Sequence, residues 1–283
     1  MNQEEIIIIG SNGQLGTALK VKYPSATAVD YADLDITNTK QLNEFDWSKY
    51  KIILNAAAYT NVDGAETKEG RINAWKINAI GPANLAKISS QNDLTLLHIS
   101  TDYVFDGTVE IHNENESYSP LSVYGASKTA GDIAVSQIEK NYILRTSWVI
   151  GKGNNFVRTM VNLGSRGINP TVVSDQVGKL TFTSELVRAI DFLIKNNSPY
   201  GTYNLTNDGK EASWADVTRT IFEMMNIKNT VTDIKTVEYY KGKDGIAPRP
   251  LNSVLSLDKI HSTGFESKDW KQELKKYINE ETS

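Results

Sequence analysis

Short apolar runs in the first half of the chain alternate with longer segments whose apolar positions have helical spacing. The predicted strands are residues 6–9, 27–30, 52–55, 94–99 and 142–145, and the predicted helices are 14–23, 72–91 and 125–139. Apolar strands that alternate with helices are typical of a parallel sheet covered by helices on both faces. The pattern predicts an α/β fold with a Rossmann-type doubly wound parallel sheet, whose ligands bind beyond the carboxyl ends of the strands.

The rhythm becomes less regular after residue 147. Helices are predicted at 154–163, 185–196, 213–225 and 270–279, a short strand at 172–173, and a loop with Gly and Pro at 241–251. Ser213, with Asp216 three residues on, is a good N-terminal cap for the third of these helices. We predict a dinucleotide-binding domain over 1–147, to which segments of 171–201 return, and a smaller C-terminal substrate-binding lobe formed mainly by 148–283.

A glycine-bearing turn, GSNGQLG at 10–16, follows the first predicted strand and opens a helix. Glycine lets the backbone approach a pyrophosphate closely, and the helix N-terminus supplies N–H donors and the positive end of the helix dipole. A tight strand-to-helix turn is the simpler alternative, but the strand–turn–helix context favours dinucleotide binding. The candidate cofactor-binding residues of this loop are Gly10, Asn12, Gly13, Gln14, Leu15 and Gly16.

Acidic residues at the end of the second strand bear on which cofactor binds. Asp30 lies 20 residues after Gly10, where a carboxylate can accept a hydrogen bond from a ribose 2′-hydroxyl and would repel a 2′-phosphate. This favours NADH over NADPH without excluding either. Asp35 and Ile36 are expected to border the adenine. Further cofactor contacts are expected just after the third strand, at Ala56, Ala57, Ala58 and Tyr59.

The segment from Tyr124 to Lys128, YGASK, is the most informative one for chemistry. Residues four apart lie on one face of a helix, so the Lys128 ammonium can sit near the Tyr124 phenol. A nearby positive charge lowers a phenol pKa that is ordinarily about 10. We therefore expect Tyr124 to donate a proton to a carbonyl that is being reduced, and Lys128 to tune it and hold the nicotinamide ribose.

Two other polar residues are candidates for the same site. Thr101, at the end of the fourth predicted strand, would hydrogen-bond the substrate carbonyl oxygen or simply cap the strand. Asn78, in the middle of a predicted helix, would order a water beside Lys128 or bond back to its own helix.

Composition narrows the class of protein. A net charge of −4 with both signs mixed along the chain argues against nucleic-acid binding, and the absence of cysteine excludes disulfides and thiolate metal sites. His98, His112 and His261 lack the spacing of metal ligands. Apolar stretches stay well short of the roughly 18 residues of a membrane helix. We expect a cytoplasmic protein that neither binds nucleic acid nor enters a membrane.

Together these segments resemble the extended short-chain dehydrogenase/reductase superfamily, and within it the dTDP-4-dehydrorhamnose reductases. The similar segments, in order, are GSNGQLG at 10–16, LDIT at 34–37, NAAAYTNVDGAE at 55–66, STDYVFDG at 100–107, SPLSVYGASK at 119–128, RTSWVIGKGNNF at 145–156 and RPLNS at 249–253. Nucleotide-sugar dehydratases of this superfamily have Thr-Asp-Glu where this chain has Thr101, Asp102 and Tyr103. The resemblance thus implies reduction of a 4-keto-sugar nucleotide by NADPH or NADH without loss of water.

The resemblance also implies a set of substrate contacts. They are Thr101, Asp102, Phe105, Tyr124, Trp148, Asn155, Phe156 and Arg249, the last facing the diphosphate. Some members of the family are dimers bridged by magnesium through acidic residues, one of them just after the glycine loop. This chain has Thr17, Ala18 and Leu19 there, so we predict a metal-independent monomer or weak homodimer.

Two other functions stay open. One is reduction of a different nucleotide-linked keto-sugar. The other is a non-catalytic, cofactor-binding regulatory subunit, like those of methionine adenosyltransferase. A subunit of that kind has no need to keep Thr101, Tyr124 and Lys128.

Overall fold

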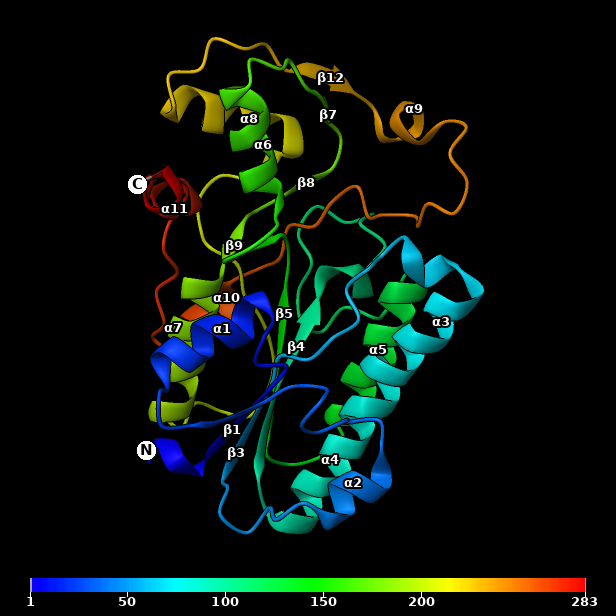
Figure 1. The fold of residues 1–283 in the computed structure, drawn as a ribbon, viewed down its shortest axis with the longest axis vertical. Helices are drawn as coiled ribbons and strands as arrows, with labels where there is room; N and C mark the ends of the chain where they lie inside the picture. The colour runs from blue at the N-terminus through cyan, green and yellow to red at the C-terminus, as the bar shows by residue number, and fades with distance from the viewer. Residues whose placement is uncertain (1, 283) are drawn as a thin grey trace.

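A six-stranded parallel sheet forms the centre of the protein, for which a computed structural model describes residues 2–282 (Figure 1). Its strands are β1 (Ile6–Ile9), β2 (Thr27–Val29), β3 (Ile52–Asn55), β4 (Thr95–Thr101), β5 (Asn141–Thr146) and β10 (Gly201–Asn204), in the order β10-β5-β4-β3-β1-β2. The chain leaves β1 on one side for β2 and then crosses to the other side for β3. This reversal makes a crevice at the carboxyl ends of β1 and β3, and the Rossmann-type prediction is confirmed.

Helices cover both faces of the sheet. One face carries α1 (Gln14–Lys22), α7 (Thr183–Lys195) and α10 (Asp258–His261), and the other carries α2 (Thr39–Glu44), α4 (Gly81–Asn92) and α5 (Val123–Val135) (Figure 1). Side chains of a strand point alternately to its two faces. Ile6 and Ile8 accordingly enter the core beneath α1 and α7, whereas Ile7 and Ile9 enter the core beneath α2 and α4. Each of the four is at most 1% exposed, and such burial contributes about 1.5–3 kcal/mol per side chain.

The helix predicted at 72–91 is interrupted by a wider turn. It consists of α3 (Lys68–Trp75), a π-helical turn (Lys76–Ile80) and α4. Asn78 lies at the centre of the π turn and is fully buried. Helix α5 packs directly against this turn, because a Cβ on Gly131 would lie only 2.2 Å from the Asn78 carbonyl oxygen. Single π turns are frequent at functional sites.

A second core lies beyond the carboxyl ends of the strands. Helices α6 (Phe156–Ser165), α8 (Trp214–Met224) and α11 (Trp270–Thr282) pack around it. Short strands join it in pairs: β6 (Val149–Ile150) with β9 (Thr181–Phe182), β7 (Thr171–Val173) with β12 (Thr232–Ile234), and β8 (Val177–Gly178) with β11 (Ala212–Ser213). The predicted cap of α8 is present as a capping box between Ser213 and Asp216. Helix α9 (Thr236–Tyr240) precedes the predicted loop.

The chain passes between these two parts several times. After β7 and β8 in the smaller part, α7 and β10 return to the large sheet, where Gly201 to Asn204 pair with Tyr142 to Arg145. The domain boundary at residues 147 and 148 stays a prediction.

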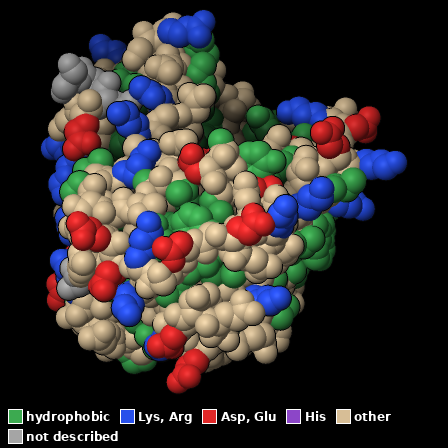
Figure 2. All heavy atoms as spheres, turned by 60° about the horizontal axis from the view of Figure 1, so that its bottom comes forward, with side chains coloured by type: hydrophobic (Ala, Val, Ile, Leu, Met, Phe, Trp, Pro, Cys, Tyr) green, Lys and Arg blue, Asp and Glu red, His purple; other side chains and the backbone are tan. Residues whose placement is uncertain are grey.

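Acidic and basic side chains are interspersed on the face drawn in Figure 2. That face lacks the continuous basic patch that is typical of a protein that binds a polyanion. Among residues 2–282, no helix combines the length and the apolar character needed to cross a bilayer.

The glycine loop offers a test of how tightly the first turn packs. A Cβ on Gly16 would lie 2.1 Å from the Gly10 carbonyl oxygen, whereas a Cβ on Gly13 would lie 3.5 Å from the same atom. Gly16→Ala is therefore expected to lower the free energy of unfolding by about 1–3 kcal/mol, and Gly13→Ala by distinctly less. Urea denaturation of the two variants measures the difference. Equal losses would contradict the packing argument.

Candidate active site

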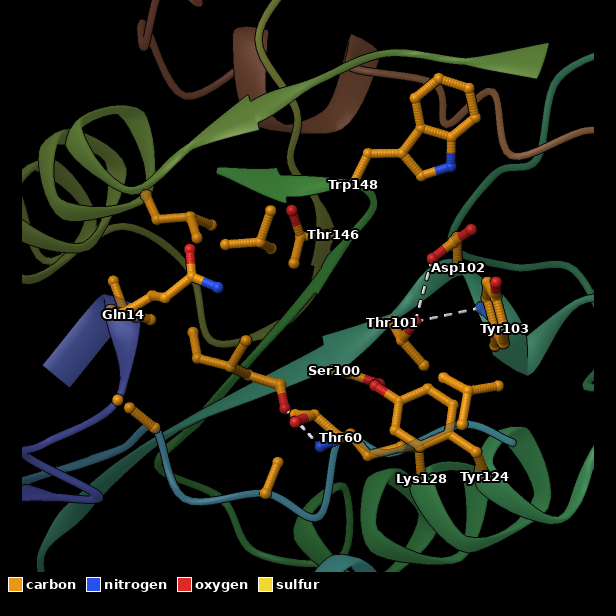
Figure 3. A pocket seen from close by; sticks show the side chains of 18 of the residues that line it. Gln14, Thr60, Ser100, Thr101, Asp102, Tyr103, Tyr124, Lys128, Thr146 and Trp148 are labelled. Carbon is orange, nitrogen blue, oxygen red and sulfur yellow. Dashed lines mark hydrogen bonds between the residues drawn. The ribbon is translucent and has the colours of Figure 1, made fainter. Parts of the chain in front are cut away.

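A cavity of about 640 Å³ opens at the carboxyl ends of the central strands, between the sheet and the smaller part of the chain. The glycine loop, the end of β4 and the start of α5 line one side, and Trp148 and Trp214 line the other. Figure 3 shows Thr101 and Asp102 entering from the end of β4, Tyr124 and Lys128 from α5, and Gln14 from the start of α1. The segments that the sequence picked out independently therefore meet in one crevice.

A smaller cavity of about 240 Å³ adjoins it across the glycine loop. It is lined by Gly10, Asp30, Asp35, Ile36 and Ala57, all of them predicted cofactor contacts. Both cavities share Gly13, Ala56 and Ala58, so an extended ligand can run from one to the other over the start of α1.

The glycine loop has the features of a dinucleotide cradle. Gly10 has φ +78°, a conformation that favours glycine, and a Cβ there would lie 2.5 Å from the Ala57 backbone nitrogen. Gly13 caps α1 without a side chain, which leaves the N–H groups of the first turn open to a phosphate. The Gln14 Oε1 atom lines this region, is buried, and has no hydrogen-bond partner within residues 2–282. These residues fit a nicotinamide dinucleotide.

Asp30 also holds the loop in shape. Its carboxylate accepts hydrogen bonds from the backbone N–H groups of Asn12 and Tyr31, both at 2.8 Å. Asn12 in turn accepts a hydrogen bond from the Lys20 ammonium at 3.2 Å. A carboxylate and an ammonium thus both lie close to the expected ribose 2′ position.

Helix α5 delivers the Tyr124–Lys128 pair to the cavity. Ser122 caps its first turn by accepting from the Gly125 N–H, and a Cβ on Gly125 would lie 2.3 Å from the Tyr103 carbonyl oxygen. The helix can therefore abut the end of β4. Tyr124 and Lys128 both line the cavity, as their spacing predicted.

The predicted direction of the Tyr124 pKa is wrong in this structure. Burial raises that pKa above its ordinary value, the Asp102 and Asp132 carboxylates raise it further, and a hydrogen bond with Thr101 lowers it only in part. The Lys128 Nζ donates to the Ile99 carbonyl at 2.6 Å and lies 3.3 Å from the His98 Nε2. Burial lowers the pKa of Lys128 to about 8, and Asp132 opposes this shift. Of the two groups, Lys128 is the one whose pKa is shifted toward neutral pH.

Thr101 connects Tyr124 to a buried carboxyl group. Its hydroxyl donates to Asp102 Oδ1 at 2.9 Å and accepts from the Tyr103 N–H at 3.2 Å (Figure 3). Burial raises the pKa of Asp102 to about 6, against hydrogen bonds from Ser253 and Thr101 that lower it. A hydroxyl has one proton to donate, so Thr101 accepts from Tyr124 while Asp102 is ionised.

Several predicted contacts serve the fold instead of lining a cavity. Phe105 is fully buried and stacks on the His112 ring, with the ring centroids 4.7 Å apart. Asn155 caps α6 and donates to Gly151 and to Tyr277. Phe105 has no exposed surface to offer a ligand, which corrects that expectation, whereas a substrate contact of the partly buried Asn155 stays a prediction.

The Asn78 side chain does not bond back to its own helix, and its ordering of a water stays a prediction. Its Oδ1 accepts from the Tyr59 N–H at 2.8 Å, and its Nδ2 donates to the Tyr59 carbonyl and to Ser127 Oγ. With Asn78 fully buried, this clamp joins the loop after β3 to α5. Tyr59 is held through its backbone, and the clamp supports the cavity from behind.

Arg249 lies in a third cavity of about 250 Å³ with Phe156. Its guanidinium pairs with Asp63 at 2.9 Å and lies over the Tyr240 ring. The RPLNS segment is thereby tied to the loop after β3, and a diphosphate would have to compete with Asp63 for this arginine.

Sequence reasoning missed several residues around the cavities. Trp214 stacks on Trp148 with ring centroids 3.6 Å apart, and Trp148 has φ +48°, an uncommon conformation for a bulky residue. Gln176 and Tyr240 line the third cavity. His98, taken as uninformative, contacts Lys128. A histidine within a continuous apolar strand was the signal that could have identified it.

A dinucleotide cradle joined to a tyrosine and lysine on α5 defines an oxidoreductase site of the short-chain dehydrogenase/reductase type. The family model described as "RmlD substrate binding domain" matches residues 4–283, and the chain belongs to that family. A dTDP-4-dehydrorhamnose reductase from Aggregatibacter actinomycetemcomitans is 34% identical, over 95% of this chain and 97% of its own. Among residues 2–282 there is no cluster of three acidic or histidine side chains that could hold a metal ion.

Solved structures of the same kind superpose closely. A dTDP-4-dehydrorhamnose reductase from Clostridium acetobutylicum has a TM-score of 0.90 and 39% identity, covering 98% of this chain and 99% of its own. Another from Bacillus anthracis, in complex with NADP, has a TM-score of 0.89 and 38% identity, covering 97% and 98%.

The lowered pKa of Lys128 predicts the pH dependence of reduction. A lysine with pKa about 8 carries its charge below that pH and loses it as the pH rises. Because the ammonium stabilises the phenolate left after proton transfer, kcat/KM for carbonyl reduction should be level below about pH 8 and fall tenfold per pH unit above it. Initial rates from pH 6 to 10 measure this. A profile that stays level to pH 10 would contradict it.

Replacing Asp30 by asparagine is expected to change the cofactor preference. Asp30→Asn keeps an acceptor for the Asn12 N–H and removes the charge that repels a 2′-phosphate. The ratio of kcat/KM with NADPH to that with NADH should rise roughly tenfold. Asp33→Asn, a nearby acid that accepts from the Asp30 N–H, is the matched control and should leave the ratio unchanged.

Proposed function

We propose that this protein reduces dTDP-4-dehydro-6-deoxy-L-mannose to dTDP-L-rhamnose with NADPH or NADH, in the biosynthesis of cell-surface polysaccharide. The observation that carries the proposal is the cavity in which Thr101, Tyr124 and Lys128 lie beside a dinucleotide cradle. Full-length similarity to dTDP-4-dehydrorhamnose reductases supports the choice of substrate. We also propose that the protein is a cytoplasmic monomer or weak homodimer.

The side chains around the cavity have different roles in the reduction. The bound nicotinamide supplies the hydride to the sugar C4. To hold the keto oxygen between the end of β4 and the start of α5, Tyr124 turns its hydroxyl hydrogen from Thr101 to that oxygen, and Thr101 turns its own from Asp102. Tyr124 gives its proton to that oxygen, and Lys128 stabilises the phenolate that remains. Trp148 and Trp214 close the opposite side and exclude water from the reacting carbon.

The residue after Asp102 favours simple reduction over dehydration. Tyr103 occupies the position at which the dehydratases have glutamate, and its ring packs edge-on against Tyr124 with centroids 5.7 Å apart. Burial raises the pKa of Tyr103, so it stays a neutral phenol. The site thus has no second carboxylic acid next to Asp102 to help expel a hydroxyl group.

We assign the nucleotide to the third cavity, which shares Tyr103 and Trp214 with the reaction cavity. Tyr239, Tyr240 and Phe156 offer faces for a base, Gln176 offers an amide, and Arg249 offers a guanidinium for the diphosphate. Because the same features suit other nucleotide-linked 4-keto-sugars, such sugars are the second candidate substrates.

Replacing Tyr124 by phenylalanine tests the proton donor. Tyr124→Phe keeps the packing against Tyr103 and removes the hydroxyl, so kcat for keto-sugar reduction should fall about 10²–10⁴-fold. The affinity for NADPH, followed by quenching of protein fluorescence, should change little. Tyr118→Phe, which alters a tyrosine outside the cavity, is the control. Unaltered NADPH oxidation by Tyr124→Phe would contradict the mechanism and would favour a non-catalytic role.

A further inference from the structure

A group of polar and charged side chains is buried behind the reaction cavity. Asn55 on β3, His98 on β4, Lys128 and Asp132 on α5, and Arg145 on β5 are each at most 2% exposed. Arg145 Nε donates to Asp132 Oδ2 at 3.2 Å, so these two charges largely compensate one another. Buried charges are costly unless they are paired. The remaining charge of the group is that of Lys128.

The orientation of the Asn55 amide determines which nitrogen of His98 carries a proton. Asn55 Oδ1 accepts a hydrogen bond from the Ala57 N–H at 3.2 Å. The amide atom that faces His98 is therefore the nitrogen, Nδ2. That Nδ2 lies 3.0 Å from His98 Nδ1 and donates to it. An imidazole nitrogen that accepts a hydrogen bond carries no proton, so the proton of the neutral ring is on Nε2.

His98 Nε2 faces Lys128. It lies 3.3 Å from the Lys128 Nζ and 3.9 Å from Asp132 Oδ1. A neutral amine can accept a hydrogen bond from an N–H group, whereas an ammonium has no lone pair and is repelled by it. Burial and the Lys128 charge hold the pKa of His98 well below its usual value, so the ring stays neutral. The imidazole therefore favours the uncharged form of its neighbour.

We propose that His98 is a positioning residue of the active site: held by Asn55 with its Nε2–H toward Lys128, it makes the Lys128 ammonium a stronger acid and so a ready proton source for Tyr124. This inference rests on the proposed function. After Tyr124 has protonated the substrate oxygen, one proton passes from Lys128 Nζ to the phenolate. The amine that remains accepts the His98 hydrogen bond and regains a proton from water when the product leaves.

Burial already lowers the pKa of Lys128, and the other charged groups around it do not add to this effect. Asp132, on the same helix, favours the ammonium, and Arg145 on β5 is engaged with Asp132. Tyr124 and Asp102 lie on the cavity side, and an ionised Asp102 would also favour the ammonium. His98 is the group that presents a donor to Nζ. Asn55 in turn is held by Ala57, whose loop lines the cofactor cavity, so the tautomer is linked to the shape of that loop.

The tautomer can be measured without any assay of activity. The chain has three histidines, so ¹⁵N-histidine labelling gives three sets of ring signals. His98 is identified by the loss of its ring signals in His98→Phe. We expect a pyridine-type shift for Nδ1 and a pyrrole-type shift for Nε2. The reverse assignment, with the proton on Nδ1, would overturn the proposal, and the wild-type spectrum decides it.

The effect on Lys128 is tested by the pH profile of His98→Phe. Removing the Nε2–H while keeping an aromatic ring should move the alkaline fall of kcat/KM upward by about 1 pH unit. His261→Phe, which changes a histidine that bonds to Ser267 and does not line the cavity, should leave the profile in place. A fall that stays in place or moves to lower pH in His98→Phe would overturn the proposal. If wild-type protein reduces no keto-sugar, the proposed function fails, while the NMR experiment still decides the tautomer.

Discussion

The close packing of α5 against its neighbours is the constraint on which the rest of the site depends. Two glycines make it possible, since Gly125 lies against the Tyr103 carbonyl and Gly131 against the Asn78 carbonyl, where side chains would not fit. With α5 at this distance, Tyr124 reaches Thr101 at the end of β4 and Lys128 reaches the Ile99 carbonyl of the same strand. If α5 lay farther from the sheet by the width of a side chain, neither Tyr124 nor Lys128 would reach the cavity.

The π turn around Asn78 belongs to the same arrangement. Its side chain bonds both the Tyr59 backbone and Ser127, so it joins the loop after β3 and the turn to α5. Ala57, in that loop, fixes the Asn55 amide, which orients His98 behind Lys128. The cofactor cavity and the proton donor are therefore connected through buried hydrogen bonds, which are costly to leave unpaired.

Sequence patterns predicted the sheet, the glycine loop and the Tyr124–Lys128 pair because each depends on local rules. Four isoleucines in a row specify a strand buried on both faces, and a spacing of four places two side chains on one helix face. The direction of the Tyr124 pKa could not be predicted in this way. It depends on how completely the phenol is buried and on where Lys128 points, and both are set by contacts with β4 that are distant in sequence.

Three residues that the sequence placed at the ligands share a physical property. Asn155, Asn78 and Arg249 are polar groups of recognisable motifs, yet each bonds to another part of the chain. A polar side chain at least partly withdrawn from water must find partners, and in a crevice between two parts of a chain the nearest partners are loops and helix ends. A motif thus contains both the residues that face a ligand and the residues that hold them there. Sequence alone does not separate the two groups, because both need the same hydrogen-bonding side chains.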